Sequence, residues 1–283
     1  MEEKNIILVP VDFTERTLNA LEFTYSLAKI QNSVIYLLHV IIESNPLWGL
    51  FGHKEQNELK EKLKEKLIEY AQLLSKKVNI EIVPIVEQGG LVDTIIKVGN
   101  KYNVKFLVMG TSYKPNLKTK LIGSNALRII NEVNFPVITL KNKPEGDTIK
   151  NIVLPLDLTK ETKQKVSYAI NFGKLYDATV HVCTINTSSD IYVIGRLKIQ
   201  LEQIYNFLKS HNINCTQTFL NSESGVNKMC EKLLEFSHSV NADLIMIMTK
   251  QDTNLERLFL GSLAAEIIHN FDIPVMSIAP KPQ

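Results

Sequence analysis

The chain has 283 residues, of which 45% are hydrophobic and 22% charged, and its formal net charge is +2. This composition is typical of a globular protein long enough for two domains, and the small net charge argues against a nucleic-acid-binding protein. No apolar run approaches the roughly 18 residues of a membrane span, and the N-terminus lacks the basic start of a secretory signal. The three cysteines, without a C-x-x-C pair, are expected to be reduced, packed thiols. We therefore expect a cytoplasmic protein that contacts neither nucleic acid nor membrane.

The first half of the chain alternates strand-like runs with helical patterns. Strand-like runs occur at residues 6–9, 34–40, 80–86, 106–109 and 137–140. Between them, apolar residues recur at helical spacing after Thr14, over 54–77 and over 91–102. We expect the hydroxyl of Thr14 to accept a hydrogen bond as the N-cap of the first helix. Strands that alternate with helices predict βαβ units and a parallel sheet covered on both faces.

The same pattern occurs twice in the chain. VPVDFT, from Val9, matches LPLDLT, from Leu154, which places Asp12 on Asp157 at an offset of 145 residues. Further along, IGSNALRIINEVNFPVITL matches LGSLAAEIIHNFDIPVMSI at an offset of 138. Two sets of anchors in the same order indicate a tandem duplication. We expect one domain at residues 1–146 and a second at 147–283, with a polar linker, KNKPEGDTIKN, around the boundary.

The stretch GTSYKPNLKTKLIGS, residues 110–124, follows the fourth strand-like run and precedes a helix. Parallel sheets bind ligands beyond the carboxyl ends of their strands, where the strand order reverses, and the first strand ends at Asp12. Gly123, Ser124 and Asn125 open a helix whose N-terminus offers unpaired N–H groups to an anion, and three lysines of the stretch add positive charge. The same tripeptide is also an ordinary turn and N-cap, so a phosphate site and a solvated basic turn both stay open.

Motifs of the common enzyme classes are absent. The sequence contains no G-x-x-x-x-G-K-[ST], no G-x-G-x-x-G after a strand, no H-E-x-x-H and no G-x-S-x-G. His39 is expected to be a buried imidazole with a satisfied hydrogen bond. No residue pattern pairs a nucleophile with its own base, so the sequence predicts neither an enzyme nor a metal site.

The chain resembles a tandem universal stress protein over nearly all of both halves. The likeness is carried by VPVDFT with its helix, the second strand ending LLHV, the loop that leads to Gly-Ser, and the strand PVITL. It implies an α/β fold of two flavodoxin-like, Rossmann-like doubly wound domains, each with a five-stranded parallel sheet of order 3-2-1-4-5. It also implies pairing through the last strands, as an internal pseudo-dimer of the two halves or as a homodimer.

Nucleotide-binding members of that family show Gly, two residues, Gly, nine residues, and Gly-Ser or Gly-Thr. Here Gly110 and Gly123-Ser124 fit this spacing, and Tyr113 stands at the second glycine. The resemblance implies ATP or a related adenine nucleotide, often with Mg²⁺, with the base and ribose near Asp12 and Val40 and the phosphates on the glycine loop. The residues expected to bind the nucleotide are Pro10, Asp12, Val40, Gly110, Gly123, Ser124 and Asn125.

Two departures from the pattern bear on function. Tyr113 carries a Cβ, which would be strained at a positive φ, and its ring could obstruct the phosphate path. In the second copy, Met248 and Gln251 replace both loop glycines and Ile185 replaces Val40, although Asp157 and Gly261-Ser262 persist. We expect no nucleotide in the second copy.

Two functions therefore remain open from the sequence. The first is a stress-response regulator that binds an adenine nucleotide in its N-terminal domain without fast turnover. The second is a stress protein without nucleotide that acts as an interaction or dimerisation module. An ATP-using enzyme of the wider adenine-binding group would carry Ser-Gly-Gly after the first strand, where Asp12-Phe13-Thr14 stands. The loop around Trp48 stays open between a lid, a partner-facing patch and a core cluster.

Overall fold

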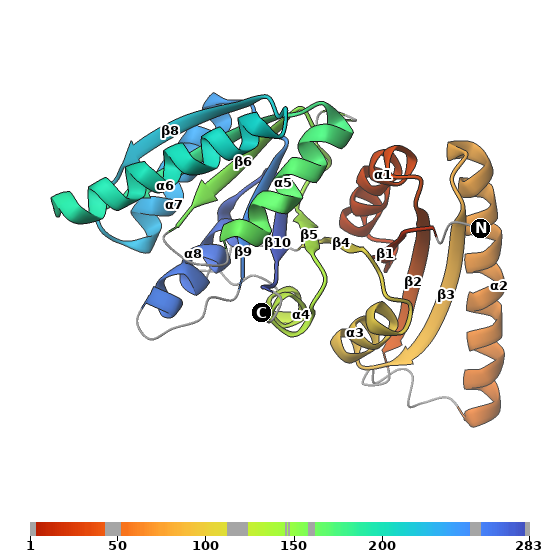
Figure 1. The fold of residues 1–283 in the computed structure, drawn as a ribbon. Coiled ribbons are helices and arrows are strands. Elements are labelled where there is room, and N and C mark those ends of the chain that lie inside the picture. Colours follow the sequence, from red (N-terminus) through yellow and green to blue (C-terminus); the bar gives the residue numbers. More distant parts are fainter. Residues whose placement is uncertain are drawn as a thin grey trace. The chain divides into compact units, whose positions relative to one another are not determined.

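The computed structural model describes residues 4–42, 52–111, 124–144, 146, 148–157, 162–249 and 256–280. The described residues up to 143 form one compact unit and those from 144 onwards form another, close to the boundary expected at 146. The loop around Trp48, Tyr113 and Gly123 lie outside the described residues. Each unit is an α/β sandwich in which helices cover a parallel sheet (Figure 1).

The N-terminal unit is built on five parallel strands in the order β3-β2-β1-β4-β5, which is the order that the resemblance implies. The strands are β1 (Ile6–Pro10), β2 (Val34–Ile42), β3 (Ile82–Gly89), β4 (Phe106–Gly110) and β5 (Val137–Leu140). The helices are α1 (Glu15–Ile30), α2 (His53–Val78), α3 (Leu91–Lys101) and α4 (Ser124–Glu132). The expected strands therefore exist, and β5 has the bounds that the sequence predicted.

The two faces of this sheet are covered by different helices. Right-handed crossovers place α1 and α2 on one face and α3 and α4 on the other. In agreement, α1 packs on β1 and β4, α2 packs on β3, and α3 packs on β2 and α4. The central strands are apolar throughout because both of their faces are buried, and Ile7, Leu8 and Val9 of β1 are fully inaccessible to solvent.

The C-terminal unit repeats this topology, with its strands in the order β8-β7-β6-β9-β10. The strands are β6 (Asn151–Leu156), β7 (Thr179–Asn186), β8 (Cys215–Asn221), β9 (Leu244–Met248) and β10 (Val275–Ile278). The helices are α5 (Thr162–Tyr176), α6 (Ile191–Ser210), α7 (Val226–Ser239) and α8 (Glu256–Asn270). The tandem repeat of the sequence is thus a repeat of the fold.

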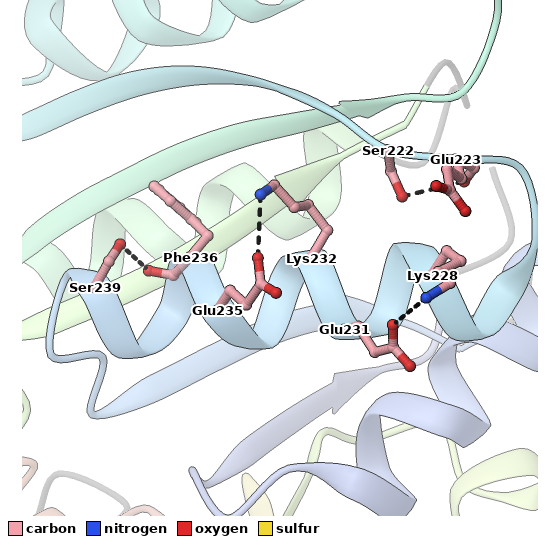
Figure 2. Close-up of polar contacts among 8 residues, drawn as sticks. All are labelled: Ser222, Glu223, Lys228, Glu231, Lys232, Glu235, Phe236 and Ser239. Atoms are coloured by element: carbon pink, nitrogen blue, oxygen red, sulfur yellow. Dashed lines mark hydrogen bonds and ion pairs between the residues drawn. The ribbon is translucent and has the colours of Figure 1, made fainter.

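Helix α7 illustrates how the outer helices divide between core and solvent. Its buried face carries Met229, Cys230 and Leu233. On its outer face, Figure 2 shows the ion pairs Lys228–Glu231 and Lys232–Glu235, each at 3.1 Å with both side chains largely exposed. Exposed pairs of this kind contribute little to stability, so the apolar face fixes the helix in place.

None of the helices, over the residues that the structure describes, is long and apolar enough to cross a membrane. The three cysteines are buried thiols outside any disulfide, as expected from the sequence. Burial raises the pKa of the Cys183 thiol to about 12, well above its ordinary value of 9.0.

We expect the native protein to resist thiol reagents such as DTNB at mildly alkaline pH, because the thiolate is the reactive form and all three thiols are buried. In denaturant all three should react, and the released chromophore counts them. The pKa of Cys183 is higher in the folded protein than in the unfolded chain. The protonated thiol therefore makes its full contribution to the free energy of unfolding below pH 9.0, and this contribution is lost as the pH rises towards 12. Rapid reaction of one thiol in the native protein would contradict this burial.

Candidate functional site

A cavity of about 240 Å³ lies in the N-terminal unit at the carboxyl ends of β1, β2 and β4. Its lining residues are Pro10, Val11, Asp12, Thr14, Arg16, Thr17, Leu38, Val40, Ile42, Leu91, Ile95, Met109, Gly110, Thr111, Asn125 and Ala126. The chain passes from β1 outwards to β2 and β3 and then returns to β4 on the other side of β1. The cavity therefore lies where the strand order reverses, the place at which open parallel sheets bind ligands.

Five of the seven residues expected to bind nucleotide line this cavity: Pro10, Asp12, Val40, Gly110 and Asn125. Ser124 is the first residue of α4, as the sequence predicted, and Gly123 lies outside the described residues. The structure thus brings together residues that are up to 115 positions apart in the chain. The carboxyl ends of β1, β2 and β4 and the start of α4 therefore form one site.

The carboxylate of Asp12 is held by the first turn of α1. Its Oδ1 accepts hydrogen bonds from the Thr14 N–H at 3.0 Å, the Thr14 hydroxyl at 2.5 Å and the Thr17 hydroxyl at 2.9 Å. The expected role of Thr14 is therefore wrong in its chemistry. Thr14 is the N-cap residue by position, but its hydroxyl donates to Asp12 and makes no cap hydrogen bond to the helix.

This network determines the charge of Asp12. Partial burial by itself would raise the pKa of the carboxyl, but the hydrogen bonds from Thr14 and Thr17 and the nearby Arg16 charge outweigh burial. The net pKa is lowered below its ordinary value of 3.8. Asp12 is consequently an ionised acceptor at neutral pH, oriented by its own loop and directed at the cavity. The hydrogen bonds from Thr14 and Thr17 all reach Oδ1.

The turn that orients Asp12 depends on an unusual backbone at Phe13. This residue has φ of 61°, a left-handed conformation that is uncommon for a bulky side chain. Its ring packs 5.6 Å from the His39 ring and 5.7 Å from the Tyr70 ring, centroid to centroid. The Nδ1–H of His39 donates to the Val11 carbonyl at 2.9 Å, so the imidazole is satisfied as expected, although it is only half-buried. The aromatic cluster fixes the loop that carries Asp12.

Gly110 is a glycine for a reason that sequence reasoning did not identify. A Cβ on Gly110 would lie 2.5 Å from the carbonyl oxygen of Arg16 and 2.7 Å from its carbonyl carbon. The first turn of α1 therefore packs directly on the Gly110 backbone. The expected role of this glycine was close approach to a phosphate, whereas the contact that requires it in the structure is the approach of α1.

The helix that carries the Gly-Ser pair starts at a different point in the two repeats, as α4 in the first and α8 in the second. In the N-terminal unit, α4 begins at Ser124, and Asn125 is exposed and lines the cavity. In the C-terminal unit, α8 begins at Glu256, so Gly261 and Ser262 lie inside the helix. The Gly-Ser pair that persists in the second copy is thus not at a helix N-terminus and cannot offer unpaired N–H groups to an anion.

Other lining residues were not among those expected to bind a ligand. An apolar wall comes from β2, β4 and α3, and consists of Leu38, Ile42, Leu91, Ile95 and Met109. A cation, Arg16, lies in the first turn of α1, where the helix dipole favours acidic residues. A cation at this helix position is a signal that could have identified Arg16 from the sequence.

The model of the universal stress protein family matches residues 4–141 and 148–278, which is nearly the whole chain. The chain belongs to this family. Universal stress protein MJ0577 of Methanocaldococcus jannaschii is 30% identical over 153 residues, which cover 48% of this chain and 94% of that protein. A universal stress protein of Helicobacter pylori is 27% identical over 138 residues, covering 48% of this chain and 98% of that protein.

A solved structure supports the tandem fold. The crystal structure of a universal stress protein from Archaeoglobus fulgidus covers 98% of this chain, and 96% of that chain is matched, with a TM-score of 0.78 at 21% sequence identity. At this identity the likeness establishes the fold of the two universal stress protein repeats.

Proposed function

We propose that this universal stress protein is a stress-response regulator that binds ATP or a related adenine nucleotide in its N-terminal unit without fast turnover. The observation that carries the proposal is the cavity at the switch point of the sheet, which gathers five of the seven expected residues. The cavity combines an apolar wall with a few convergent polar groups, as small-molecule sites do. Its volume of about 240 Å³ lies just below the usual range of roughly 300–1,000 Å³.

The apolar wall suits a planar base. Leu38, Val40 and Ile95 provide aliphatic surface, and burial of a base against such surface is favourable. The ionised Asp12 can accept a hydrogen bond from an exocyclic amine or a ribose hydroxyl. Its lowered pKa makes it a poor general base at neutral pH, which fits binding without hydrolysis.

The phosphates belong at the opposite end of the ligand from Asp12, because two negative charges repel one another. The N-terminus of α4, with Asn125 on the cavity, offers N–H groups and the positive end of a helix dipole to the phosphates. Among the residues that the structure describes, no three His, Cys, Asp or Glu side chains gather to hold a metal ion. A Mg²⁺ ion would therefore enter on the triphosphate, as it does in many phosphate sites.

The test is to count nucleotides. Protein purified without added nucleotide is denatured, and released adenine nucleotides are quantified by chromatography; stripped protein is then titrated with ATP, with and without Mg²⁺. We expect about one nucleotide per chain. Neither release nor binding at millimolar ATP would overturn the proposal in favour of an interaction module without nucleotide. Two nucleotides per chain would overturn its restriction to the N-terminal unit.

A further inference from the structure

The C-terminal unit contains a fully buried lysine. Lys165, on α5, is 1% exposed. Its Nζ donates a hydrogen bond to the carbonyl of Pro155 and lies 3.9 Å from Oδ2 of Asp157. A buried ammonium group is costly unless acceptors and an opposite charge surround it, and Lys165 has both. The contacts of Lys165 therefore compensate for the burial of its charge.

The groups around this ammonium correspond to residues of the N-terminal cavity. At the repeat offset of 145, Pro155 and Asp157 correspond to Pro10 and Asp12, both of which line that cavity. Lys165 itself corresponds to Ala20, a buried residue of α1 with no polar side-chain atom. The duplication has thus placed a cation where the first repeat has only a methyl group.

The sheet register supports this correspondence. Pro10 pairs with Leu38 in the first repeat, and Pro155 pairs with Cys183 in the second. Leu38 lines the N-terminal cavity, and the Lys165 charge acts on the Cys183 thiol. The Lys165 ammonium therefore lies among the counterparts of three residues that surround the cavity in the first repeat.

A second polar side chain of the C-terminal unit contacts the segment that carries Asp157. Gln200, on α6, donates from Nε2 to the backbone carbonyl of Asp157 at 2.6 Å. At the counterpart of Gly110, Met248 is 1% exposed and is part of the core. The second repeat thus supplies its own polar and apolar groups where the first repeat leaves a cavity.

We propose that the Lys165 side chain is a built-in ligand of the C-terminal repeat, an internal primary ammonium that fills the counterpart of the N-terminal cavity and neutralises Asp157. The consequence that the chain binds one nucleotide rests on the proposed function. The ammonium site itself does not, because it is argued from the surroundings of Lys165, namely Pro155, Asp157 and Cys183. Removal of the lysine beyond its Cβ should create a site for a small primary alkylammonium ion.

The experiment is chemical rescue of Lys165→Ala. The missing fragment is n-propylammonium, and its chloride salt is added to wild type, to Lys165→Ala and to Lys165→Met, with tetramethylammonium chloride at equal concentration as the control for salt. Scanning calorimetry should show a Tm for Lys165→Ala lowered on the order of 10 °C, since one partner of a buried ion pair is lost. n-Propylammonium should restore part of that loss in this variant alone.

The outcomes separate the two proposals. If Lys165→Ala folds only when n-propylammonium is present, that result is itself the rescue. The ammonium site is refuted if n-propylammonium raises the Tm of Lys165→Ala no more than it raises the Tm of Lys165→Met or of the wild type. It is also refuted if Lys165→Ala stays unfolded in the presence of the amine while Lys165→Met folds. Nucleotide binding by the wild type is measured separately, so its failure would remove the proposed function and leave the rescue result standing.

Discussion

Replacing Gly110 by alanine is expected to lower the free energy of unfolding of the N-terminal unit by about 1–3 kcal/mol, the usual cost of overpacking. The new Cβ would lie 2.5 Å from the carbonyl oxygen of Arg16, which is backbone and cannot rotate away as a side-chain tip could. The first turn of α1 must therefore shift. Because Thr14 and Thr17 orient Asp12 from that turn, the shift should also weaken nucleotide binding.

Urea titration followed by tryptophan fluorescence measures this effect, since the only tryptophan, Trp48, belongs to the N-terminal half of the chain. The matched control is Gly52→Ala, the N-cap of α2, where a Cβ would meet nothing closer than the Glu55 side chain at 3.6 Å. The control should lose only about 0.5 kcal/mol, from the weaker capping of alanine. Equal stability of Gly110→Ala and wild type would show that α1 does not need the glycine.

Much of the fold could be predicted from the sequence because buried parallel strands are short, continuous apolar runs. Val137–Leu140, for example, was predicted with the bounds that β5 has in the structure. Strand ends beyond the apolar run were less predictable. β3, for example, continues through Glu87 and Gln88 to Gly89, since backbone pairing with β2 holds polar residues in the strand as well.

The site was predictable where a residue's place followed from the strand order, and unpredictable where it depended on a contact distant in the sequence. Asp12 follows from the end of β1, whereas Val40, two residues before the end of β2, was expected only from the family resemblance. The approach of α1 to Gly110 joins segments about a hundred residues apart, and no local pattern encodes it. The sequence also did not reveal that α8 begins at Glu256, before Gly261-Ser262, because a Gly-Ser pair can occur both at the start of a helix and inside one.

Lys165 shows a signal that was present and could have been used. In the aligned repeats it stands at the place of Ala20, on the helix face that packs against the sheet. A lysine on a buried helix face is rare unless it is paired, so this alignment alone points to an acidic or carbonyl partner. The partner, Asp157, belongs to the same repeated motif.

The second large effect is expected for Asp12→Asn, which should weaken binding of ATP roughly tenfold or more, because a hydrogen bond to a charged group contributes about 1.5–3 kcal/mol. Asparagine keeps an oxygen that can accept from the Thr14 N–H, so the loop should survive while the charge that faces the ligand is lost. Isothermal titration of stripped protein measures the change in Kd.

The repeat supplies the matched control for this variant. Asp157→Asn makes the same chemical change at the corresponding position of the C-terminal unit, where Lys165 takes the place of a ligand, and should leave the Kd for ATP unchanged. The pKa of Asp12 lies below 3.8, so the affinity of the wild type for ATP should show no loss from titration of this carboxyl until the pH falls to that value. The ionised carboxylate also stabilises the fold, and this stabilisation is lost only as the pH falls through the lowered pKa. If Asp157→Asn weakened binding as much as Asp12→Asn, the nucleotide would not be held by the N-terminal cavity alone, and the division of roles between the two repeats would have to be abandoned.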